Sequence, residues 1–273
     1  MKKVCSGLHQ LGIPQWSTAM PGAIRNPSQA MLNQQPSELK VIYLSSCINQ
    51  TMGLTKGAPV KQPLVRETCA LLHKAGYEVI FPKNMKNLCC GQIWESKGMT
   101  DIADRKTVET ELALYKAIEG GRWPVLCDQS PCLHRLKKMV TRVKLYEPAE
   151  FIFTFLKDRL TFHPTHRPVA IHLTCSTREM GLSDAMLEVA RMCTDNVFVP
   201  EGIGCCGFAG DRGFSRPELN NWALRSLQGQ IAEHHIERGY SNSRTCEIGL
   251  EAHAGIPYMS IVYLVNECTE PRG

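Results

Sequence analysis

The chain has 273 residues, of which 43% are hydrophobic and 21% are charged, and its formal net charge is +5. These proportions are typical of a soluble globular protein with one large or two ordinary domains. The mild positive charge is dispersed, which argues against a nucleic-acid-binding protein. The sequence shows no apolar run long enough to span a bilayer and no export signal. We therefore expect a cytoplasmic protein whose 13 cysteines stay reduced.

The first half of the chain begins with a segment, 1–39, that contains four prolines among Ser, Gln and Asn and shows no hydrophobic periodicity. We predict an extended arm or linker there. Short apolar runs then alternate with amphipathic segments. The pattern predicts strands at 40–46, 77–81 and 123–127, and helices near 64–72 and 108–121.

The second half repeats this alternation after a predicted helix at 146–160 and a loop. Strands are expected at 168–174, 196–199 and 258–265, and helices at 183–193 and 215–239. In the long second helix, Ser215 and Glu218 form an expected capping box, and Trp222 lies on its apolar stripe. Strands alternating with helices favour an α/β fold with parallel, Rossmann-like sheets.

A Cys-Cys-Gly triplet occurs twice, as NLCCGQ and later as GIGCCGFAG. Each triplet follows a strand and a proline, and each copy also has one cysteine after its first strand. There are 41 residues between Cys90 and Cys132 and 39 between Cys206 and Cys246, which favours Cys132 over Cys127 as the equivalent of Cys246. The chain is therefore an internal duplication with four cysteines in each copy, namely Cys47, Cys89, Cys90 and Cys132, and Cys175, Cys205, Cys206 and Cys246.

The predicted organisation follows from this duplication. It consists of an arm at 1–39, a first domain at 40–145, a helix and loop at 146–167, and a second domain at 168–273. Loops at the carboxyl ends of parallel strands converge, so the four cysteines of each copy are expected to meet at one rim of its sheet.

Four clustered thiolates are suited to an iron–sulfur cluster or to zinc. The glycines around the pairs, of which we select Gly91, Gly204 and Gly207 as cofactor-binding, let backbone N–H groups approach sulfur. Zinc sites usually take a pair of cysteines two to four residues apart, which favours iron–sulfur here. Two further residues stay open at this stage. Cys127 is either a strand core residue or an extra thiol, and His172 is either a core histidine or part of the site.

The motifs resemble a known family. CCG twice, each with an upstream and a downstream cysteine, looks like the cysteine-rich CCG domain pair found in heterodisulfide reductase, in the glycolate oxidase iron–sulfur subunit and in lactate-utilisation proteins. The stretches CCGFAGDRGFSRPEL and SNSRTCEIGLEAHAGIPYMSIVYLV are similar to the carboxy-terminal part of FAD-linked iron–sulfur D-lactate dehydrogenases. The resemblance covers about residues 40–268.

The resemblance implies an oxidoreductase component with one or two [4Fe-4S] clusters held by the eight cysteines. It would pass electrons from a flavin that oxidises D-lactate or another 2-hydroxy acid toward a quinone or cytochrome. The family pattern ends each domain with CxxC, but Arg135 and Gly249 occupy the last cysteine positions here, which puts five-thiolate clusters in doubt. The FAD domain and ferredoxin motifs are absent, so we expect a split-gene subunit or a truncated copy.

The expected partners are thus an FAD-binding dehydrogenase chain and a ferredoxin-type module. Peripheral association with the inner face of the membrane through these partners is a further alternative. No nucleic-acid partner is expected. The main alternative is a zinc-stapled docking scaffold without electron transfer, because four thiolates also suit zinc. A thiol–disulfide enzyme is the third alternative, disfavoured by the strain of a disulfide between neighbouring cysteines.

Overall fold

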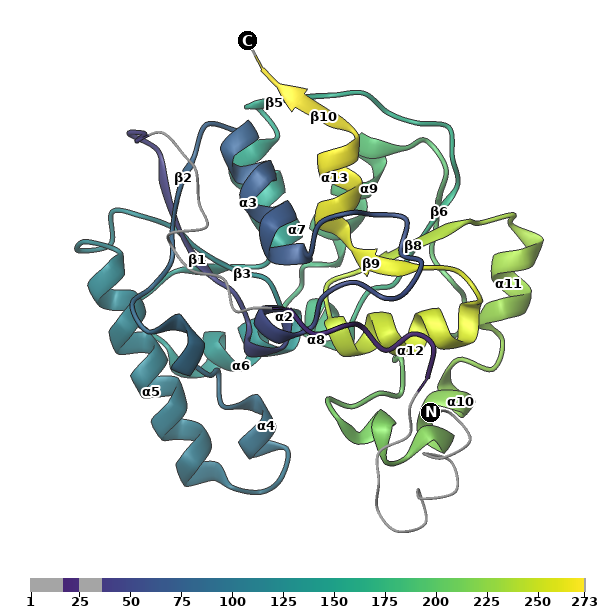
Figure 1. The fold of residues 1–273 in the computed structure, drawn as a ribbon, viewed down its shortest axis with the longest axis horizontal. Coiled ribbons are helices and arrows are strands. Elements are labelled where there is room, and N and C mark those ends of the chain that lie inside the picture. The colour runs from purple at the N-terminus through teal and green to yellow at the C-terminus, as the bar shows by residue number, and fades with distance from the viewer. Residues whose placement is uncertain (1–16, 25–35, 273) are drawn as a thin grey trace.

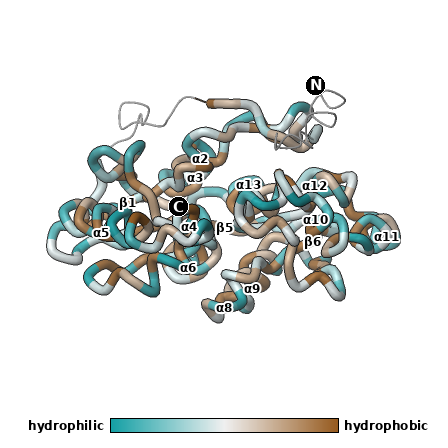
Figure 2. The backbone as a smooth tube through the Cα atoms, turned by 90° about the horizontal axis from the view of Figure 1, so that it is seen from below, coloured by the Kyte–Doolittle hydropathy of each residue, from teal (hydrophilic) through white to brown (hydrophobic). Residues whose placement is uncertain are grey.

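The structure is a computed structural model that describes residues 17–24 and 36–272. Over these residues it contains two four-stranded parallel sheets and one two-stranded antiparallel sheet. The predicted α/β fold with two parallel, Rossmann-like sheets is therefore confirmed. Two lobes lie side by side along the longest axis, one containing α5 (Thr100–Ala117) and the other α11 (Leu227–Glu233) (Figures 1 and 2).

The first sheet lies entirely within residues 40–146 and its strands have the order β2-β1-β3-β4. Its strands are short, buried and rich in Val, Ile and Leu, as expected for a sheet covered on both faces. The elements of this half are β1 (Lys40–Leu44), α2 (Cys47–Thr51), α3 (Leu64–Lys74), β2 (Glu78–Ile80), the 3₁₀ turn η3 (Met85–Asn87), α4 (Gln92–Glu95), α5, β3 (Val125–Cys127), α6 (Ser130–Met139) and β4 (Leu145–Tyr146).

The second sheet has the order β7-β6-β8-β9, which is the same order as in the first sheet once the strands of each half are counted from its start. This shared topology supports the internal duplication inferred from the cysteine spacing. The elements of this half are β6 (Val169–Ile171), α8 (Cys175–Glu179), α9 (Ser183–Cys193), β7 (Val197–Phe198), the 3₁₀ turn η5 (Arg212–Phe214), α10 (Pro217–Ala223), α11, β8 (Arg238–Ser241), α12 (Arg244–Ala254), β9 (Tyr258–Ser260) and α13 (Ile261–Glu267).

A connecting segment joins the two halves. It contains α7 (Pro148–Phe151), a π-helical turn η4 (Ile152–Leu156) and β5 (Leu160–Phe162), and β5 pairs antiparallel with β10 (Thr269–Pro271) at the end of the chain. The helix predicted at 146–160 thus corresponds to α7 and η4.

Side chains of each sheet alternate between two cores. Val41 and Tyr43 of β1 face a large core that they share with Val169 and Ile171 of β6. Helices α3 and α13 pack against each other within this shared core, between the sheets (Figure 1). The opposite faces of the sheets meet separate, smaller cores, which contain Cys90 and Cys127 in the first half and Cys206 and Cys246 in the second half. The domain boundaries stay a prediction, since the shared core joins both halves.

The predicted arm falls largely outside the described residues. Its described part packs on the protein: Ala19 is buried in the smaller core of the second half, and Gly22 N–H donates to the carbonyl of Leu54 at 2.9 Å. Among the described residues, no helix is both long and apolar enough to cross a membrane.

Candidate metal centres

The first centre forms where β1, β2 and β3 end. Cys47 is the first residue of α2, directly after β1, and Cys89 and Cys90 follow β2 and the η3 turn. Cys132 lies in the first turn of α6, after β3. These four thiols line one narrow cavity together with Cys127, the last residue of β3. The structure thus brings together the four cysteines selected from the sequence and adds Cys127 as a fifth sulfur in the wall.

The thiols of the first centre share protons unevenly. Hydrogen bonds from Cys47 and Cys90 lower the pKa of Cys89 to about 2, although burial opposes this shift. The hydrogen bond with Cys89 raises the pKa of Cys47, and burial raises this pKa further. The contact with Cys132 raises the pKa of Cys90 well above its usual range. Burial likewise raises the pKa of Cys127. A thiolate is therefore favoured at Cys89, which is hydrogen-bonded by neighbouring thiols.

The second centre forms at the equivalent end of the second sheet. Cys175 begins α8 after β6, the pair Cys205–Cys206 follows β7, and Cys246 lies in α12 after β8. The Cys206 thiol donates to the sulfur of Cys246 at 2.8 Å. Cys175 and Cys205 are exposed, whereas Cys206 and Cys246 are buried. The second set of predicted cysteines thus also gathers at one place.

Two thiolates are favoured in the second centre. Hydrogen bonds from Cys175 and Cys206 lower the pKa of Cys205 to about 2 against the effect of burial. The Cys206 thiol lowers the pKa of Cys246 to about 5, opposed by burial and assisted by the imidazole of His172. The contact with Cys205 and burial raise the pKa of Cys175. Because metals bind the thiolate form of cysteine, the lowered pKa values of Cys89, Cys205 and Cys246 favour metal binding over protonation at these thiols.

The glycine that follows each pair has the same role in both halves. Gly91 N–H donates to Cys89 Sγ at 3.4 Å, and Gly207 N–H donates to Cys205 Sγ at 3.3 Å. Both glycines have positive φ, +88° and +72°, and a Cβ would lie 2.4 Å from a backbone carbonyl oxygen in each case. Only glycine fits there. Gly204 differs, because its carbonyl accepts from Arg178 Nη1 at 3.1 Å and no N–H contact with sulfur is found for it among the described residues.

Arg135 and Gly249 stand at the two positions where the family pattern places a fifth cysteine, and each of them has a different role there. Arg135 donates from Nε to the carbonyl of Cys90 at 3.1 Å and forms ion pairs with Glu95 and Asp104. At Gly249, a Cβ would lie 2.6 Å from Asn220 Nδ2. The supporting role of Arg135, which holds the loop of the first pair, was missed from the sequence. Its position three residues after Cys132 is the signal that could have found it.

His172 joins the second centre. Its imidazole, Cys206 and Cys246 offer ligand atoms that all lie within 4.8 Å of one another, and all three residues are buried. In the part of the chain that the structure describes, Nε2 of His172 has no hydrogen-bond partner. The donor sets of the two centres, thiolates supported by backbone N–H groups, fit an iron–sulfur cluster and also fit zinc.

The segments that carry Cys132 and Cys175 meet at a hydrogen-bonded interface between α6 and α8. Ser130, two residues before Cys132, accepts from Ser176 at 2.8 Å and from Thr174 at 3.2 Å. Thr174 and Ser176 flank Cys175. Buried hydroxyl groups therefore connect the polypeptide around one centre directly to the polypeptide around the other.

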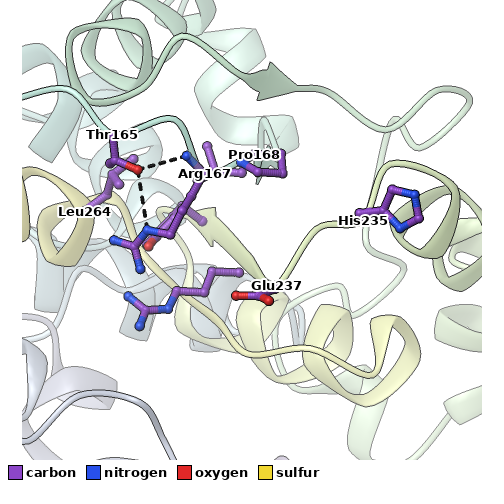
Figure 3. A pocket seen from close by; sticks show the side chains of 9 residues that line it. Thr165, Arg167, Pro168, His235, Glu237 and Leu264 are labelled. Atoms are coloured by element: carbon purple, nitrogen blue, oxygen red, sulfur yellow. Dashed lines mark hydrogen bonds between the residues drawn. The ribbon is translucent and has the colours of Figure 1, made fainter.

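A separate pocket lies at the opposite, amino-terminal end of the second sheet (Figure 3). It has a volume of about 150 Å³, and its wall includes Thr165, Arg167 and Glu237. Arg167 donates from its backbone N–H to Thr165 Oγ1 at 2.9 Å and forms an ion pair with Glu267. The polar groups of Arg167 are thus partly engaged with Thr165 and Glu267. No cysteine is among the described residues that line this pocket.

The solved structures that match this chain are only distantly similar to it. An aspartate racemase homologue from Pyrococcus horikoshii is 12% identical, with 84% of this chain and 96% of that chain covered and a TM-score of 0.31. Aspartate racemase from Picrophilus torridus is 10% identical, with 87% and 96% covered and a TM-score of 0.38. At these TM-scores the likeness supports no inference about function.

Two curated relatives share much of the chain. Lactate utilization protein A from Oceanobacillus iheyensis is 23% identical over 221 residues, which cover 71% of this chain and 81% of that protein. Lactate utilization protein A 1 from Bacillus mycoides is 24% identical over 182 residues, which cover 62% of this chain and 74% of that protein. Residues 41–137 match the family model described as CCG, cysteine-rich domain, and the second half repeats the strand order and the four cysteines of that matched region.

Proposed function

We propose that this protein is an iron–sulfur electron-transfer component of lactate oxidation. The observation that carries the proposal is the gathering of two equivalent sets of four thiols at the carboxyl ends of two equivalent sheets. The CCG match over 41–137 and the similarity to two lactate utilization proteins support it.

Each centre would hold one [4Fe-4S] cluster through its four cysteines. Cys47, Cys89, Cys90 and Cys132 would hold the first, and Cys175, Cys205, Cys206 and Cys246 the second. Such a cluster supplies one-electron transfer when bound. The residues of the chain position the sulfur atoms, and the N–H groups of Gly91 and Gly207 stabilise the thiolates of Cys89 and Cys205. Arg135 and Gly249 occupy the positions of the fifth cysteine of the CxxC pattern, so neither centre has a thiolate there.

The exposure of the thiols is consistent with exchange of electrons with a partner. Cys47, Cys175 and Cys205 are exposed, whereas the other thiols of the two centres are buried or half-buried. The hydroxyl network of Ser130, Thr174 and Ser176 brings the two centres to a common interface. An electron could therefore enter at one centre, cross this interface and leave at the other.

The proposal includes partners that the chain needs for a complete reaction. A flavin-binding dehydrogenase chain would oxidise D-lactate or another 2-hydroxy acid, and a ferredoxin-type module would connect it to this protein. The electrons would then pass to a quinone or cytochrome. The protein would work in the cytoplasm, with access to the inner face of the membrane through these partners.

The proposal is tested by replacing one thiolate of the second centre. With the flavoprotein partner present, Cys205→Ser is expected to leave flavin reduction by D-lactate intact and to reduce acceptor reduction at least tenfold, because the centre loses a ligand. Cys69→Ser is the matched control, since Cys69 is buried in the shared core and is not one of the eight repeated cysteines. Acceptor reduction by Cys205→Ser at the rate of the control would contradict the proposal.

A zinc-stapled docking subunit is the second candidate. It is favoured by the compact group of His172, Cys206 and Cys246, because a mixed set of cysteine and histidine ligands is common in structural zinc sites. Protein that contains zinc and no acid-labile sulfide, and that still binds its flavoprotein partner, would support this candidate.

A further inference from the structure

His172 lies where its side chain must face the second centre. It directly follows β6, and its N–H donates to the carbonyl of Tyr240 at 2.9 Å, which continues the pairing of β6 with β8. Side chains alternate along a strand, so His172 faces the same side as Ala170, which lies in the core that contains Cys206 and Cys246. Only 3% of the residue is exposed.

The imidazole lies beside the sulfur of Cys246, whose thiolate it favours, yet its Nε2 atom makes no hydrogen bond of normal geometry with any described residue. The ligand atoms of His172, Cys206 and Cys246 all lie within 4.8 Å of one another. Burying a polar nitrogen without a partner is unfavourable, so this arrangement is better explained by a ligand that the nitrogen binds.

The duplication provides an internal comparison. Counted back from Cys47 and Cys175, which both begin a helix, Leu44 stands in the first half where His172 stands in the second. Leu44 pairs in register with Cys127 of β3. The pairing of Ile171 with Tyr240 places His172 beside Ser241 of β8.

Each centre therefore has one additional side chain that could bind a metal, which is Cys127 in the first and His172 in the second. The two side chains belong to different strands of their sheets and offer sulfur and nitrogen, respectively. The first centre has a leucine on its first strand and a thiol, Cys127, on the third. The second centre has an imidazole, His172, on its first strand and a hydroxyl, Ser241, on the third. The two centres are not equivalent, although their eight repeated cysteines are.

We propose that His172 is a ligand of the metal in the second centre through Nε2. The second centre then has a mixed sulfur and nitrogen donor set, and the first has sulfur alone. If the metal belongs to an iron–sulfur cluster, this inference rests on the proposed function. Because a four-iron cluster needs four protein ligands, nitrogen coordination would replace one of the four thiolates assigned above to the second centre. Cys205 accepts the Gly207 N–H, so the thiolate replaced would be that of Cys175.

This asymmetry has a consequence for the direction of electron flow. A neutral imidazole in place of an anionic thiolate makes the centre less negative, and replacing cysteine by histidine ligands raises the potential of iron–sulfur centres. With clusters bound, the second centre would thus be the more easily reduced one, and electrons would pass from the first half of the molecule to the second.

The test uses the full chain with Cys90→Ser, so that only the second centre carries a cluster. After reconstitution and reduction with dithionite, pulsed EPR is expected to show the coupling of a directly bound ¹⁴N nucleus. His172→Leu, which introduces the residue of the first half, should remove this coupling and lower the reduction potential. His166→Leu is the control, because His166 is an exposed histidine that pairs with Asp195, and it should change neither result. A spectrum without a bound nitrogen in the parent chain would overturn the assignment, whatever the potentials.

A second measurement separates this inference from the proposed function. Cobalt(II) is titrated into sulfide-free protein, again with Cys90→Ser, and the absorption bands of the bound metal are recorded. His172→Leu is expected to weaken cobalt binding at least tenfold. His172→Cys keeps a donor atom without nitrogen, so it should bind cobalt tightly with a spectrum typical of sulfur ligands alone. Equal cobalt affinity in the parent chain and in His172→Leu would count against His172 as a ligand.

The experiments distinguish a failure of the His172 assignment from a failure of the proposed function. A loaded iron–sulfur cluster without bound nitrogen defeats the role of His172 only. Protein that never incorporates sulfide, yet binds cobalt through His172, defeats the proposed function and leaves the ligand assignment standing.

Discussion

Single residues next to the cysteine pairs determine whether the loops can close around a metal. Gly91 and Gly207 both combine a positive φ with a crowded Cβ position and an N–H group that donates to sulfur. The sequence showed that glycines surround each pair, and from this the approach of backbone to sulfur could be predicted. It could not distinguish Gly204, whose carbonyl binds Arg178, because that difference depends on the path of the folded loop. The assignment of Gly204 as cofactor-binding stays a prediction.

Two glycine substitutions in the same loop test this account. Gly207→Ala is expected to lower the free energy of unfolding by about 2–4 kcal/mol, because the new Cβ meets the carbonyl of Leu219 in addition to the strain of a positive φ. Gly210→Ala is the matched control. Gly210 has φ +76° but no atom within 4 Å of the Cβ position, so only the strain of about 1 kcal/mol applies. Urea unfolding of the metal-free protein measures both values, and equal losses would contradict the crowding at Gly207.

At the scale of elements, the sequence predicted β1, β2, β3, β6 and β7, which precede most of the site cysteines, better than it predicted the helices. The segment 215–239 was expected to be one helix with a capping box, but it forms α10 and α11 with a break at 224–226. Arg216, not Ser215, precedes α10, and no side-chain cap is formed there. The break rotates the apolar stripe, so that Trp222 is 71% exposed instead of lying in the core. A single periodic stripe cannot reveal such a break, because the break depends on tertiary packing, in which α11 lies against α12.

The segment 258–265 was also predicted wrongly, as one strand. It changes from β9 to α13 at Ser260, whose side chain accepts from Val262 N–H and begins the helix. Ile261 to Val265 are buried on every side, so hydrophobic periodicity does not distinguish a helix from a strand there. The core shared by the two halves depends on α13 and was therefore missed as well.

The division of the long helix leads to a prediction about two of its apolar residues. Leu227→Ala is expected to cost about 2–5 kcal/mol of unfolding free energy, because Leu227 is fully buried in the smaller core of the second half. Trp222→Ala should change stability by about 0.5 kcal/mol or less, since its ring is exposed and contacts mainly Arg225. Thermal unfolding of the two variants gives the comparison. A loss with Trp222→Ala as large as that with Leu227→Ala would mean that the helix is continuous in solution.

At the scale of the whole molecule, the duplication is the feature that the sequence revealed most fully. The repeated cysteine spacing predicted two equivalent sites, and the structure shows two sheets of identical strand order with four thiols at the same end of each. The sequence did not predict that the segments next to Cys132 and Cys175 would be joined through Ser130, Thr174 and Ser176. That contact depends on how the halves pack, and no local pattern records it.

The metal content of the protein tests the central claim most directly. Iron, zinc and acid-labile sulfide are measured on protein purified without oxygen, together with an EPR spectrum after reduction with dithionite. We predict about eight irons and eight sulfides per chain with the signal of reduced clusters, because each of the two four-thiol sets takes one [4Fe-4S] cluster. Cys90→Ser should lower both numbers by about half. Zinc without sulfide, or iron and sulfide that do not fall in Cys90→Ser, would contradict the assignment of these thiols to iron–sulfur clusters.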